Sequence, residues 1–186
     1  MMLGLCGNAD DAKLLEQKVL ASGERYRIGL DGIMAGYVLL TGEQGMDLID
    51  REKVADKSEE FSEHIAAAQM IRFLWQYAPD AIPKRRLIAS MRKLVDNSKV
   101  ADVVIPDLAR WEDWGLTEHL VSLYGTEGYD IPFIQRKILH FCMAAVDSVP
   151  EGTTEPPKYA AVAGRFLKKI ERRPELYNLA KKGYYR

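Results

Sequence analysis

The segment IPKRRLIASMRKLV (residues 82–95) decides how the rest of the chain is interpreted. Leu87, Met91 and Leu94 recur every three to four positions, whereas basic residues such as Arg86 and Arg92 are expected to turn away from them. This period is that of a helix with one apolar face. Similar stripes recur in the second half of the chain, and no convincing strand pattern interrupts them. The sequence therefore predicts an all-α protein.

Turn signals divide the chain at nearly constant intervals. They begin at residues 7, 42, 79, 113 and 150, so successive turns lie 35, 37, 34 and 37 residues apart. Each turn follows an apolar helix and precedes a shorter, more charged one. Such helix–turn–helix units are typical of α-solenoids, although a plain helical bundle can give a similar spacing. We predict antiparallel helix pairs that stack as a short right-handed superhelix.

The predicted organisation is a single α-helical repeat domain over residues 1–186. Its approximate repeats are 1–22, 25–56, 58–97, 99–125 and 130–173, followed by a C-terminal helix or tail at 174–186. The second helix of each pair is expected at about 9–21, 46–54, 84–95, 116–124 and 158–172. The pattern of the first residues fits the middle of a repeat, so we expect either that the first repeat is incomplete or that the chain is a fragment of a longer protein.

Two segments carry a family resemblance. LGLCGNADDAKLLE (residues 3–16) resembles the end of a first helix, the turn and the second helix of a HEAT repeat. VVIPDLAR (residues 103–110) resembles a HEAT first helix with its proline bend, since Pro106 removes one backbone hydrogen bond. The stretch from about Pro83 to Ile138 is similar to uncharacterised bacterial HEAT-like proteins. The resemblance implies a bacterial α-solenoid of the HEAT or armadillo type. The spacing of the turns departs from that family, because it is shorter than the usual ~40–47 residues.

Composition and charge exclude several classes of protein. The 186 residues are 47% hydrophobic and 28% charged, which suits a packed core and not a disordered chain. The formal net charge of −1 argues against a protein that coats nucleic acid. No apolar run approaches the roughly 18–20 residues that span a bilayer, and no signal peptide is evident. With only two cysteines, we expect a cytoplasmic protein without membrane contact.

The charge is nevertheless uneven along the chain. Residues 1–63 hold 7 basic and 13 acidic side chains, a balance of −6. Residues 158–186 hold 9 basic and 2 acidic side chains, a balance of +7. A basic C-terminal third favours an acidic surface or nucleic acid as its partner.

No motif indicates catalysis or a metal site. The histidines are His64, His119 and His140, and none has a second metal ligand at zinc spacing. Glu60 lies four residues before His64, which predicts a surface pair on one helix face. Cys6 and Cys142 are expected to be buried, unreactive thiols. We therefore predict no catalytic residue, metal or cofactor, while an enzyme or an accessory domain of one remains an alternative.

The leading prediction is a non-catalytic protein-interaction module or scaffold. Short α-solenoids bind extended partners on a surface that their second helices form, although fold alone does not dictate function. The alternative is a HEAT-like protein that binds nucleic acid weakly through its basic C-terminal third. Two tryptophans that flank two acids form either an exposed binding contact or a packed turn. The candidate binding residues are Trp111, Trp114, Lys84, Arg85, Arg165, Lys168, Lys169 and Arg172.

Overall fold

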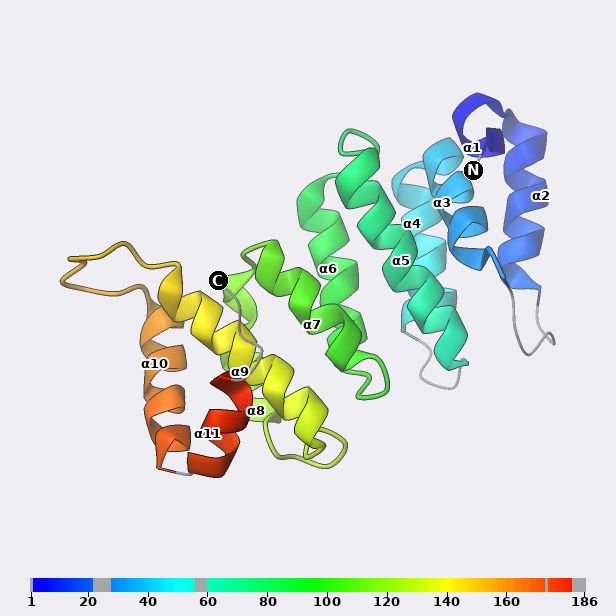
Figure 1. Cartoon of the computed structure of the whole chain (residues 1–186). Helices are drawn as coiled ribbons and strands as arrows, with labels where there is room; N and C mark the ends of the chain where they lie inside the picture. Colours follow the sequence, from blue (N-terminus) through cyan, green and yellow to red (C-terminus); the bar gives the residue numbers. More distant parts are fainter. Residues whose placement is uncertain (1, 22–27, 56–59, 173, 182–186) are drawn as a thin grey trace. The chain divides into compact units, whose positions relative to one another are not determined.

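The computed structural model describes residues 2–21, 28–55, 60–172 and 174–181. Every regular element in these ranges is helical and none is a strand (Figure 1). The all-α prediction is therefore confirmed. The chain divides into two compact units, Met1–Val100 and Ala101–Arg186, and each is described by itself.

The first unit alternates between two rows of helices. Its elements are α1 (Met2–Cys6), α2 (Ala9–Leu20), α3 (Leu30–Thr41), α4 (Glu43–Ile49), the π-helical segment η1 (Asp50–Val54), α5 (Phe61–Tyr77) and α6 (Lys84–Val95). The first helices of successive pairs pack in order, since α3 contacts both α1 and α5. On the other row, η1 continues α4 and contacts α6.

The second unit follows the same alternation. Its elements are α7 (Ala101–Arg110), the 3-10 turn η2 (Trp114–Leu116), α8 (Thr117–Leu123), α9 (Pro132–Asp147), α10 (Lys158–Glu171) and α11 (Pro174–Lys181). Helix α7 contacts α9, and α8 contacts α10, while α11 packs against both α9 and α10. Within each unit these contacts are compatible with a helical repeat, and the expected second helices coincide with α2, α4 with η1, α6, α8 and α10.

Local sequence signals account for the helix boundaries. The Asn8 side chain accepts from the N–H of Asp10 at 2.8 Å, and the Asp11 carboxylate accepts from the N–H of Asn8 at 2.9 Å. This reciprocal capping satisfies N–H groups that the start of α2 would otherwise leave unpaired. Gly42 separates α3 from α4 with φ 63°, a conformation that residues with a Cβ avoid.

The cores follow the predicted apolar stripes. Leu87, Met91 and Leu94 of α6 are fully buried, as expected. In α9 the stripe includes Ile138 and Phe141, which are also fully buried. The predicted periodicity therefore identifies the face of each of these helices that packs inward.

A π-helical segment follows α4. The N–H of Ala55 donates to the carbonyl of Asp50 at 2.8 Å, a span of five residues where an α-helix has four. Lys53 and Val54 within it are buried, whereas Arg51 is exposed. The wider turn thus accommodates one additional residue on the outer face.

Candidate functional site

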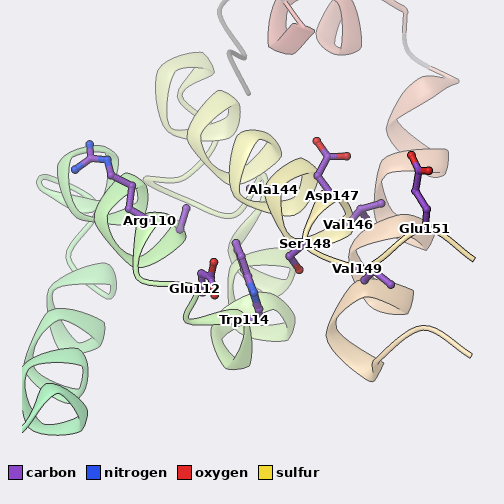
Figure 2. A pocket seen from close by; sticks show the side chains of 10 residues that line it. Arg110, Glu112, Trp114, Ala144, Val146, Asp147, Ser148, Val149 and Glu151 are labelled. Atoms are coloured by element: carbon purple, nitrogen blue, oxygen red, sulfur yellow. The ribbon is translucent and has the colours of Figure 1, made fainter. Parts of the chain in front are cut away.

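A cleft of about 580 Å³ opens in the second unit, between the C-terminal ends of α7 and α9. Small apolar side chains of both helices line part of it (Figure 2). The chemically distinctive lining residues are Arg110, Glu112, Trp114, Asp147, Ser148 and Glu151. The cleft therefore combines one aromatic ring with three carboxylates and one guanidinium.

Trp114 forms a fixed aromatic wall. Its ring meets Phe141 edge-on at a centroid distance of 5.4 Å and stacks with Tyr159 at 6.1 Å. The backbone N–H of Trp114 donates to the carbonyl of Glu112 at 2.8 Å, and its backbone carbonyl accepts from the hydroxyl of Thr117 at 2.7 Å. Held from both the ring and the backbone, this side chain presents a rigid surface to the cleft.

Glu112 occupies a backbone position that normally belongs to glycine. The N–H of Asp113 donates to the carbonyl of Leu108 at 3.0 Å, and the N–H of Glu112 donates to that of Ala109 at 3.1 Å. These two bonds form the Schellman motif that ends α7, in which the residue at C′ is left-handed. Glu112 has φ 56°, which strains an L-residue with a Cβ. This left-handed conformation places the Glu112 side chain at the edge of the cleft.

The electrostatic environment of the cleft is negative. Asp147 is the last residue of α9 and Glu112 follows α7, so both acids lie at helix ends that already carry negative partial charge. Among the described residues, neither Glu112 nor Glu151 forms an ion pair. Arg110 is engaged by Asp107, with Nη1 2.8 Å from Oδ1, and Figure 2 shows its guanidinium directed away from the aromatic wall.

The structure separates the sequence-predicted binding residues into groups. Trp114 lines the cleft, whereas Trp111 is half-buried just after α7 and is not among the lining residues. Lys84 and Arg85 are exposed on α6 of the first unit. The Lys84 ammonium lies 4.8 Å from the centroid of the Trp75 ring, so it packs on α5.

The remaining predicted residues share one face of α10. Arg165, Lys168, Lys169 and Arg172 are all exposed and follow one another at positions i, i+3, i+4 and i+7. We call these four residues the basic strip. Lys182, a further basic residue of the C-terminal third, lies outside the described residues.

A polar cluster around the buried carboxylate of Asp50 escaped the sequence analysis. Arg86 was expected to face away from the core, but it bonds to Asp47 at 2.7 Å and to Asp50 at 2.8 Å. Lys93 adds a contact of 2.7 Å to the same Asp50, which is 4% exposed. Burial lowers the pKa of Arg86, but the two carboxylates outweigh it and raise the pKa above its ordinary value. Here the expected orientation was wrong, because periodicity does not reveal acids supplied by another helix.

The structure corrects two further expectations. Cys142 is buried, and burial raises the pKa of its thiol to about 12, but Cys6 is exposed and not buried. His64 is 1% exposed, and its Nδ1 lies 3.3 Å from the backbone carbonyl of Glu60, so the two do not form a surface pair. No group of three or more metal-type ligands occurs among the described residues.

Comparisons of the chain with protein families, with curated proteins and with solved structures find no match. Within the described ranges, no helix has both the length and the apolar character needed to cross a bilayer. The functional interpretation therefore depends on the cleft and on the surface of α10.

Proposed function

We propose that this chain is a non-catalytic protein-interaction module that binds a cationic side chain of a partner protein in the cleft. One observation carries the proposal: the C-terminal ends of α7 and α9 bring Glu112, Asp147 and Glu151 to one cleft that Trp114 also lines. A lysine or arginine placed there would interact with the carboxylates, with the helix macrodipoles and with the face of Trp114.

The unfavourable placement of these acids supports a binding role. An acidic residue at a helix C-terminus lowers the stability of the protein by roughly 0.3–1 kcal/mol relative to a neutral residue. A left-handed residue with a Cβ costs a further 1–2 kcal/mol, approximately. Glu112 combines both penalties, and Asp147 carries the first. Local rules that are broken together at one cleft favour a function for that cleft over a purely structural origin.

The same proposal includes a HEAT-like identity for the helix pairs and a cytoplasmic location. The alternating contacts within each unit support the first, as does Pro106, which lies inside α7. The low cysteine content supports the second, because both cysteines are free thiols.

The test is a titration of the intact chain with three blocked pentapeptides. Each contains alanine except at its centre, which is lysine, arginine or norleucine, and the readout is the indole N–H resonance of Trp114. A cation–π contact contributes about 0.5–1 kcal/mol and each exposed carboxylate about 0.2–1 kcal/mol. We therefore expect the lysine and arginine peptides to bind about tenfold more tightly than the norleucine peptide.

The variant Glu112→Gln/Glu151→Gln should remove most of this preference for a cation. Its matched control is Glu127→Gln/Asp130→Asn, which changes the net charge equally at exposed positions of the α8–α9 loop. Equal affinities for the lysine and norleucine peptides would contradict the proposal, as would an equal loss in the control.

Nucleic-acid binding is the second candidate function, and the basic strip on α10 is the observation that favours it. Such binding would weaken steeply as salt increases, because phosphate contacts release counterions. Retention of the intact chain on a non-specific duplex at low and at physiological salt tests it, with Lys168→Glu/Arg172→Glu as the variant. We expect binding at low salt alone, and retention at physiological salt would favour a dedicated nucleic-acid surface.

A further inference from the structure

A second cavity lies beside the basic strip. This groove of about 460 Å³ is formed by α9, α10 and α11 of the second unit. Met143, Val146, Leu167 and Tyr177 provide an apolar lining, and Gly164 forms part of the wall on α10. The groove is distinct from the cleft, although Val146 and Asp147 border both.

Gly164 creates part of this hollow. It lies in the interior of α10, where glycine weakens a helix because its backbone loses the most conformational freedom. A Cβ at this position would meet only Val146 Cγ2, at 4.0 Å, which is an ordinary van der Waals contact. Packing therefore does not require a glycine here. The missing side chain leaves apolar surface of α9 accessible from the groove.

The charges around the groove favour an acidic occupant. Lys168 and Lys181 line it, and the Lys181 ammonium lies 4.6 Å from the centroid of the Tyr177 ring. Glu171 also lines it and accepts a hydrogen bond from Tyr177, which together with burial raises the pKa of that hydroxyl but does not cancel the negative charge of the carboxylate. Asp147 is the second lining acid, so the two lysines are balanced within the groove and the excess positive charge comes from the adjacent Arg165, Lys169 and Arg172 of the basic strip.

The basic strip extends the positive region beyond the groove, since Lys168 belongs to both. An occupant that matches both features must present apolar side chains to the floor and carboxylates to the lysines. We infer that the groove docks an amphipathic, acidic segment of a partner protein, with its apolar residues against Leu167 and its carboxylates toward Lys168 and Lys181. The groove adjoins the cleft at Val146 and Asp147, but the inference does not depend on cation binding in the cleft.

Two other occupants fit the groove less well. A nucleic acid would use the basic strip, but it has no aliphatic side chains for the apolar floor formed by Met143, Val146 and Leu167. The last residues of this chain, 182–186, carry two basic side chains and no acid, so their charge does not complement the lysines.

The experiment measures the affinity of the intact chain for a designed peptide that alternates glutamate with leucine and phenylalanine. A counterpart with lysine in place of every glutamate and a non-specific DNA duplex serve as comparison probes. Gly164→Leu fills the groove from the α10 side, and Gly164→Ala fills it in part without a clash. Lys168→Glu/Lys181→Glu reverses the lining charges, and Lys18→Glu/Lys99→Glu makes the same net change at exposed positions of the first unit.

We expect the acidic peptide to bind at least tenfold more tightly than its lysine counterpart. Gly164→Leu and the lysine reversal should each weaken binding about tenfold, Gly164→Ala should weaken it several-fold, and the first-unit control should not change it. If Gly164→Leu does not fold, Gly164→Ala and the lysine reversal decide the result.

Three outcomes would overturn the inference. The first is peptide binding that neither Gly164 variant changes. The second is tighter binding of the duplex than of the peptide at the same salt concentration, which would assign the strip to nucleic acid. The third is concentration-dependent self-association that Gly164→Leu abolishes, which would make another copy of this chain the occupant.

Discussion

Replacing Glu112 with glycine should stabilise the protein, although Glu112 belongs to the candidate cleft. The substitution relieves a left-handed conformation that costs an L-residue about 1–2 kcal/mol. It also removes a negative charge after the C-terminus of α7, worth about 0.3–1 kcal/mol. Glycine has more backbone freedom than glutamate in the unfolded chain, which offsets roughly 0.5–1 kcal/mol of these two gains in stability. The net expectation is a gain of about 1 kcal/mol in the free energy of unfolding.

Urea unfolding followed by circular dichroism measures this change as an increase in the midpoint without a change in slope. Glu112→Gln retains the Cβ and isolates the electrostatic share. Glu118→Gly in α8 is the opposite control, because that residue lies within a helix and pairs with Lys158 at 2.8 Å. The Glu118→Gly variant should unfold at a lower urea concentration than the unaltered chain. A lower midpoint for Glu112→Gly would refute the reasoning, since it would mean that the carboxylate and not the backbone dominates the local energy.

Three further predictions concern stability elsewhere in the chain. Met91→Ala should lower the free energy of unfolding by about 2–5 kcal/mol because Met91 is fully buried. Arg85→Ala on the exposed side should change it by under roughly 0.5 kcal/mol. Equal losses for the two variants in urea unfolding would contradict the assignment of the buried face. Asp50→Ala should cost about 1–3 kcal/mol, because Arg86 and Lys93 lose a shared carboxylate while Arg86 keeps Asp47 and Lys93 remains half exposed. Thermal unfolding near that of the unaltered chain would show that the network contributes little. Gly164→Ala should raise stability by about 0.5–1 kcal/mol in the same assay, and a loss would reveal a steric constraint at α10.

Periodicity was sufficient to predict the helices and much of their packing. The positions of Leu87, Met91 and Leu94 in a three-to-four repeat identified the buried face of α6, because side chains at that spacing share one side of a helix. The spacing of the turns also located the second helices. Turn residues such as Gly42 interrupt the apolar stripes, so a new helix begins after each of them.

The cleft could be predicted only in part. Trp114 was a candidate because of its residue type, and its neighbour Glu112 was visible as an acid at a helix end. Asp147 and Glu151 lie more than thirty residues further along the chain, and only the contact between α7 and α9 brings them to the same cavity. The left-handed conformation of Glu112 also depends on the two backbone hydrogen bonds that end α7, and the sequence pattern does not predict these bonds.

The π-helical segment at Asp50–Val54 has a consequence for how this chain can change in length. A turn that closes over five residues contains one residue more than an α-helical turn, so the loss of one residue there can be absorbed by a return to α geometry. Deleting exposed Arg51 would then leave Lys53 and Val54 facing inward. The same deletion in the middle of α6 would rotate every later side chain by about 100° and expose its core face. Single-residue deletions within the helices of the first unit should therefore be tolerated at this turn before they are tolerated elsewhere.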